Sequence, residues 1–182
     1  MDAGDKLKTG DVAKGATGPN RTLAQASSRF NRWREAGIIP AEDHVWGPGG
    51  KAFVYPQTSG AIFAVLCDLY DAGIVTAKRQ LRTMWEYLAD PHAEGCHPHI
   101  THILDATAKG EACWLILTQW RHSETGAFQP TCCTRFEDQA DKPIAGPSPE
   151  HEPLGEYIVP LHKLLDRFTD AESNVRPLKA VQ

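Results

Sequence analysis

Apolar residues recur three or four positions apart in several stretches of the chain, which is the spacing of one face of a helix. Phe30 and Trp33 follow a capping serine, Ser27 or Ser28, and predict a helix that runs to about Ala36. Gly37 is a natural stop for it. The same spacing predicts further helices, which we place at residues 57–73, 76–89, 100–109 and 161–168.

Runs of β-type residues between turn residues predict the strands. Asp43–Trp46 and Lys51–Tyr55 flank Gly-Pro-Gly-Gly, and this pattern predicts a hairpin with a four-residue tip. Nearer the C-terminus, an apolar run at 112–120 predicts a strand that a turn joins to a second one. The remaining predicted segments are a strand at 129–136, a proline-rich loop at 143–155 and a short strand at 156–159.

This order of elements predicts an α+β protein with two parts. A basic helix, a tight hairpin and supporting helices are the components of a winged helix-turn-helix, which we expect in the N-terminal part. The C-terminal part is expected to be a small domain with a short antiparallel sheet and one or two helices. The predicted divisions are a flexible start at 1–9, the winged domain at 10–89, a linker at 90–98, the small domain at 99–170 and a flexible tail at 171–182.

The charge is distributed unevenly, although the chain as a whole carries only −4. Between Val12 and Arg34 there are five positive residues and no acid, a local charge of +5. From Asp90 to Glu172 there are fourteen acids against six bases, a charge of −8. A basic helix can enter the major groove of duplex DNA, while an adjacent hairpin lays its backbone on neighbouring phosphates. We therefore expect the N-terminal part, and not the acidic C-terminal part, to bind DNA.

The N-terminal part resembles the DNA-binding domain of MerR-like transcriptional regulators. The resemblance is carried by RFNRWREAGIIP, then WGPGGKAFVYP, then a helix that ends in DAG. It implies that the basic helix reads DNA, that Gly37–Ile39 is the turn after it and that His44–Tyr55 is the wing. The expected DNA contacts, on the helix and the wing, are Ser28, Arg29, Asn31, Arg32, Arg34, Trp46, Gly49, Gly50 and Lys51.

The chain departs from the family pattern at three places. Extra residues, PNRTLAQA, precede SSRF, so the sequence leaves open which segment forms the first helix. Lys51 stands near the place where the family's wing carries an arginine. The helix predicted over 76–89 spans under four turns and is too short for the family's dimerising coiled coil. A homodimer, which tight binding to a repeated site requires, must therefore use another surface.

Histidines and cysteines gather at HAEGCHPHITH, which contains His92, Cys96, His97, His99 and His102. These side chains suit zinc, but their spacing lacks a second ligand pair at a distance. Cys132 and Cys133 are adjacent and would point to opposite faces of a strand. Cys113 and His122 are alternatives without geometric support. We therefore predict no metal and no other cofactor, and we expect the five cysteines to be reduced thiols.

Several classes of protein fit the sequence poorly. It contains no GxSxG, HExxH, P-loop or dinucleotide motif, so we do not expect an enzyme. The longest apolar run, Ala61–Cys67, is too short to span a bilayer, and the polar start lacks a signal peptide core, so we expect a cytoplasmic protein. Two alternatives to a regulator remain: a DNA-bending, excisionase-like accessory factor, and a protein-interaction or metal-sensing module. The small domain is expected to dimerise, to contact the transcription machinery or to sense a ligand.

Overall fold

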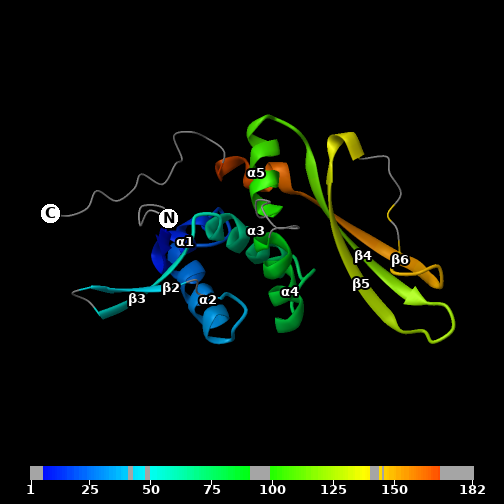
Figure 1. Ribbon diagram of the computed structural model, residues 1–182, viewed down its shortest axis with the longest axis horizontal. Coiled ribbons are helices and arrows are strands. Elements are labelled where there is room, and N and C mark those ends of the chain that lie inside the picture. The colour runs from blue at the N-terminus through cyan, green and yellow to red at the C-terminus, as the bar shows by residue number, and fades with distance from the viewer. Residues whose placement is uncertain are drawn as a thin grey trace. The chain divides into compact units, whose positions relative to one another are not determined.

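The computed structural model has a mixed α+β fold with two small antiparallel sheets (Figure 1). It describes residues 6–40, 43–47, 50–90, 99–139, 144 and 146–168, with the backbone alone at 6, 43–47, 50–51 and 167. After His102 the chain divides into two compact units, and the helix α5 (His99–Ala108) spans the division. Of the predicted linker at 90–98, only Asp90 lies within the described residues, and the tail at 171–182 lies outside them.

The first unit alternates short strands with helices. Its elements are β1 (Lys6–Lys8), α1 (Thr9–Gly15), α2 (Leu23–Glu35), β2 (Asp43–Gly47), β3 (Gly50–Pro56), α3 (Ser59–Asp71) and α4 (Lys78–Ala89). The strands form one antiparallel sheet in the order β1-β3-β2, in which Lys8 pairs with Val54 and Val45 with Ala52. Helix α1 packs against α2 and α3. The first helix among the described residues is thus Thr9–Gly15, and Thr9 belongs to the segment 1–9 that was expected to be a flexible start.

Helix α2 begins five or six residues earlier than a cap at Ser27 or Ser28 predicts. Thr22 is its N-cap: the Thr22 hydroxyl accepts a hydrogen bond from Gln25 N at 3.3 Å, and Gln25 Oε1 accepts one from Thr22 N at 2.8 Å. This reciprocal pair is a capping box, which satisfies two otherwise unpaired N–H groups. Ser27 and Ser28 lie within the helix, so the prediction that either of them caps it is wrong.

Aromatic residues form the core of the first unit. Phe30 of α2 meets Tyr55 of β3 and Phe63 of α3 edge to face, each with ring centroids 5.1 Å apart. Trp33, one turn further along α2, packs in the same way on Phe63 at 5.7 Å. All four side chains are buried. These contacts fix which face of α2 points inward and hold that helix against the strand that forms the second half of the hairpin.

The second unit is built on a three-stranded sheet. Its elements after α5 are β4 (Cys113–His122), β5 (Phe128–Phe136), a 3₁₀ turn (Glu137–Gln139), β6 (His151–Pro160), α6 (Leu161–Leu165) and a second 3₁₀ turn (Asp166–Phe168). The strand order is β5-β4-β6, and both pairings are antiparallel. The expected short sheet with one or two helices is confirmed, since α6 and part of α5 belong to this unit.

Strand β6 is longer than the sequence predicts. It begins at His151 and pairs along β4 as far as Pro160, with an irregularity between Gln119 and Trp120. The segment 151–155 is therefore strand, although its proline and glycine indicated a loop. Proline is tolerated here because β6 lies at the edge of the sheet, where one row of N–H groups needs no partner strand.

No helix among the described residues is both long and apolar enough to cross a membrane.

Gly15 marks the closest approach between α1 and α3. A Cβ atom built on Gly15 would lie 3.0 Å from the carbonyl oxygen of Gly60, a backbone atom that cannot rotate away. Gly10, in the first turn of the same helix, has nothing within 4 Å of such an atom. The two glycines therefore differ in packing and not in the type of element they occupy.

We expect Gly15→Ala to destabilise the protein by about 1–3 kcal/mol, because the added methyl group forces α1 away from α3. Gly10→Ala, the matched control, should be neutral or stabilising by up to about 1 kcal/mol, because alanine favours a helix. Urea unfolding measures both changes. Equal effects of the two substitutions would contradict the close packing of α1 on α3.

Candidate nucleic-acid interface

Helix α2 has one face in the core and an opposite face in solvent. Its buried residues are Ala26, Phe30 and Trp33. Ser28 and Arg32, which are one turn apart, lie on the exposed side. Arg29, Asn31 and Arg34 lie on the flanks between the two faces and are partly buried. The predicted DNA-reading residues of this helix therefore do not share one surface.

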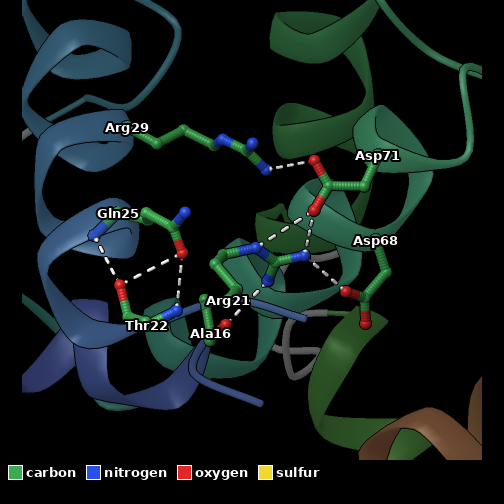
Figure 2. Close-up of polar contacts among 7 residues, drawn as sticks. All are labelled: Ala16, Arg21, Thr22, Gln25, Arg29, Asp68 and Asp71. Atoms are coloured by element: carbon green, nitrogen blue, oxygen red, sulfur yellow. Dashed lines mark hydrogen bonds and ion pairs between the residues drawn. The ribbon is translucent and has the colours of Figure 1, made fainter. Parts of the chain in front are cut away.

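The flank of α2 that carries Arg29 is tied to the end of α3. Arg29 Nη1 lies 2.7 Å from Asp71 Oδ1, and the Arg29 guanidinium stacks on the Tyr70 ring with its Cζ 5.0 Å from the centroid. Figure 2 shows the side chain extended from α2 toward Asp71. The contact is an ion pair in which Arg29 Nη1 is buried. Arg29 is thus engaged inside the unit.

Arg21 lies below Arg29 and binds the same carboxylate (Figure 2). Its Nε and Nη2 donate to Asp71 Oδ2 at 3.2 and 2.6 Å, its Nη2 donates to Asp68 Oδ1 at 2.7 Å, and its Nη1 donates to Ala16 O at 2.7 Å. The side chain is only 6% exposed. This role of Arg21 was not predicted from the sequence, although Asp68 and Asp71 are three apart on a predicted helix and thus share one face.

The pKa shifts agree with this arrangement. Burial alone would raise the pKa of Asp71, but its contacts with Arg21 and Arg29 lower that pKa below its ordinary value. Burial would lower the pKa of Arg21, but its bonds to Asp71 and Asp68 raise it. Burial also raises the pKa of the neighbouring Cys67 thiol to about 11, against the opposing influence of the two guanidinium charges. At neutral pH Arg21 and Asp71 are therefore charged, and Cys67 is a neutral thiol.

The other flank of α2 faces the hairpin. The Arg34 Cζ lies 4.9 Å above the centre of the Phe53 ring in β3, a cation–π contact, and its Nη2 lies 4.0 Å from Glu35 Oε1. Figure 1 shows the β2–β3 hairpin beside α2. Arg34 therefore connects the helix to the predicted wing and keeps only part of its surface in solvent, at 25% exposure.

The hairpin lies where the sequence predicts it, but its strands pair further toward the turn than the predicted four-residue tip allows. Trp46 pairs with Lys51 and Gly47 with Gly50, so the ladder continues to the glycines. Of the expected wing contacts, Gly49 lies outside the described residues, and for Trp46, Gly50 and Lys51 the backbone alone is described.

The positive residues between Val12 and Arg34 are mostly paired with acids that lie outside this segment. Lys14 pairs with Asp11 at 3.1 Å, while Arg21 and Arg29 share Asp71. Within the described part of the chain, Arg32 is the one positive residue of that window without a carboxylate within 4.0 Å. The field outside α2 is therefore weaker than +5 suggests, and it centres on Arg32.

A polar depression with a volume of about 680 Å³ lies along this side of α2. It is lined by Asn20, Arg21, Ala24, Gln25, Ser28, Arg29, Arg32 and Asp71. Three predicted site residues, Ser28, Arg29 and Arg32, meet here. Asn31 and Arg34 do not line it. The arrangement offers several hydrogen-bond donors and one carboxylate, which is chemistry suited to an anion.

The described cysteines and histidines do not assemble into a centre. Among residues 6–40, 43–47, 50–90, 99–139, 144 and 146–168, no group of three or more His, Cys, Asp or Glu is placed to hold a metal ion. Of the histidine-rich segment, His92, Cys96 and His97 lie outside these residues, while His99 and His102 belong to α5. Cys132 pairs with Leu117 and Cys133 with Ile116, so the two thiols point to opposite faces of the sheet. Cys113 and His122 occupy opposite ends of β4.

Comparison of the chain with protein-family models, with curated proteins and with solved structures finds no match.

The shared carboxylate predicts a dependence of stability on acid. Because folding lowers the pKa of Asp71 from about 3.9 in the unfolded chain, its stabilisation is present above pH 4 and is lost as the pH falls through the folded value. We expect Asp71→Asn to be less stable than the wild type at pH 7, and the difference to narrow below pH of about 4. Urea unfolding across this range measures it.

Asp90→Asn is the control, since Asp90 is an exposed residue just after α4. Its stability curve should run parallel to that of the wild type. An Asp71→Asn curve that also runs parallel at every pH would show that the Asp71 carboxylate contributes nothing to folding.

Proposed function

We propose that the protein binds duplex DNA in a sequence-specific manner and regulates transcription, with a first unit of the winged helix-turn-helix type found in MerR-like regulators. The observation that carries this proposal is the order of elements in that unit. Two consecutive helices, α1 and α2, pack together, and a hairpin follows directly and pairs with the strand that precedes them. In winged proteins this order presents the second helix to the major groove and the hairpin to the backbone beside it.

The exposed side of α2 supports the same function. Ser28 and Arg32 point into solvent, and Arg32 is free of carboxylates among the described residues. In the proposal these two residues contact DNA directly. Arg29 and Arg34 support the helix from its flanks, through Asp71 and Phe53 respectively. The wing residues Gly49, Gly50 and Lys51 follow the phosphate backbone.

We assign protein contacts to the second unit. Apolar side chains that are at least 46% exposed lie on its edge strands, namely Phe128 of β5 and Leu154, Tyr157 and Ile158 of β6. Large apolar side chains left in solvent, here on both edge strands, are candidates for contact with another protein. A homodimer formed through this unit would bring two winged units to one repeated site. The same observation favours the second candidate function, a module that binds another protein and does not bind DNA.

The test begins with selection of bound sites from a random pool of duplex DNA. On a selected duplex, Arg32→Ala should lose at least about 1 kcal/mol of binding free energy, because it removes the one unpaired cation of α2. Arg79→Ala removes an exposed arginine from α4 and is the matched control, expected to change binding by less than about 0.5 kcal/mol. Failure to enrich any duplex, or equal losses in the two variants, would refute the proposed interface.

A further inference from the structure

Several hydrogen-bond donors line the depression beside α2, and some of them have no acceptor among the described residues. Ser28 and Arg32 approach it from the exposed side of the helix, and Asn20 lies at its end. Asp71 is the one carboxylate in its lining, and both of its oxygens already face arginines: Oδ2 faces Arg21 and Oδ1 faces Arg29. The acid is therefore neutralised from within the fold, and the positive charge of Arg32 is left over.

The capping box fixes the orientation of Gln25 in this lining. Gln25 Oε1 accepts from Thr22 N at 2.8 Å and from the Thr22 hydroxyl at 3.1 Å. A primary amide has one acceptor and one donor end, so this arrangement turns Nε2 outward. Figure 2 shows Nε2 directed away from Thr22, on the side of Arg29. The helix cap thus presents an N–H₂ donor to the depression.

Arg29 adds charge to the same lining. Its Nη1 is buried and makes no well-formed hydrogen bond with protein among the described residues, although it lies 2.7 Å from Asp71 Oδ1. Its side chain is 17% exposed, so part of the guanidinium reaches the depression. The exposed part of the Arg29 guanidinium therefore adds positive charge beside the donors of Gln25, Ser28 and Arg32, and a tetrahedral oxyanion accepts several such contacts at once.

We propose that this depression binds a phosphate group, held by Gln25, Ser28, Arg29 and Arg32. The inference rests on the proposed function for the source of that group, which is a phosphodiester of the bound DNA strand. The volume of about 680 Å³ exceeds that of one phosphate and leaves room for the adjoining sugars. Such a site makes this side of α2 a contact with the DNA backbone, which fixes the position of the helix on the duplex.

Gln25→Glu is a selective test. Glutamate keeps the acceptor that caps α2, and its charge favours a helix N-terminus, so the fold is retained. The substitution replaces the outward donor with a negative oxygen. The chain also supplies a matched control, because Gln80 holds the same position in α4, accepts from Ala77 N at 3.3 Å and lies outside the depression. Gln80→Glu therefore makes the same chemical change elsewhere in the same unit.

The first arm titrates the ¹⁵N-labelled full chain with inorganic phosphate at constant ionic strength, with chloride as the reference. We expect saturable shifts of the amides at 20–32, weakened at least about tenfold in Gln25→Glu and unchanged in Gln80→Glu. Shifts that chloride reproduces, or that both variants retain equally, would overturn the site. The second arm measures the salt dependence of binding to a selected duplex, where Gln25→Glu should reduce the slope of log K by about one.

The two arms separate this inference from the proposed function. Phosphate binding at 20–32 without binding to any duplex supports the site and refutes the DNA-binding function. Duplex binding with the same salt slope in Gln25→Glu, Gln80→Glu and wild type supports the function and overturns the site.

Discussion

The carboxylate of Asp71 is the group on which the arrangement of the first unit depends. It receives Arg21 on one oxygen and Arg29 on the other, and Arg21 also binds Asp68 and the Ala16 carbonyl. These contacts join the end of α1, the start and middle of α2 and the end of α3. A shared, partly buried carboxylate fixes both guanidinium groups in position, and removing it would leave two cations without their partner. The rotation of α2 about its own axis is therefore set by charge as well as by the aromatic core.

That rotation divides the basic surface of α2 into parts with different uses. Arg29 and Arg34 hold the helix between α3 and β3, whereas Ser28 and Arg32 remain exposed. Arginines engaged within the unit and the exposed Arg32 thus alternate along one short helix. The same constraint produces the depression, because the neutralised Asp71 forms its wall and the capping residue Gln25 contributes an open donor. The proposed phosphate contact is in this sense a consequence of how the helix is held.

Much of the fold could be predicted from the sequence, because local patterns determine it. The helices around Phe30, Phe63 and Trp85 and the hairpin at Gly47–Gly50 follow from apolar spacing and turn residues. The site could be predicted only in part. Arg29 was expected to contact DNA, and Arg21 was counted only as a positive charge, because their counter-ions, Asp68 and Asp71, lie about forty to fifty residues later in the chain. The early start of α2 depends on the capping pair Thr22–Gln25. The length of β6 depends on its pairing with β4, although Pro153 in that segment indicated a loop.

A double-mutant cycle between Arg29 and Asp71 tests the shared carboxylate most directly. We compare four free energies of unfolding at pH 7 and low salt: those of the wild type, Arg29→Ala, Asp71→Ala and the double variant. Asp71→Ala also removes the Arg21 contact, but this effect is present with and without Arg29 and therefore cancels in the cycle. If Asp71 holds α2 through Arg29, the two changes are non-additive by at least about 0.5 kcal/mol. Additive changes would show that the ion pair does not position the helix, and would contradict the account.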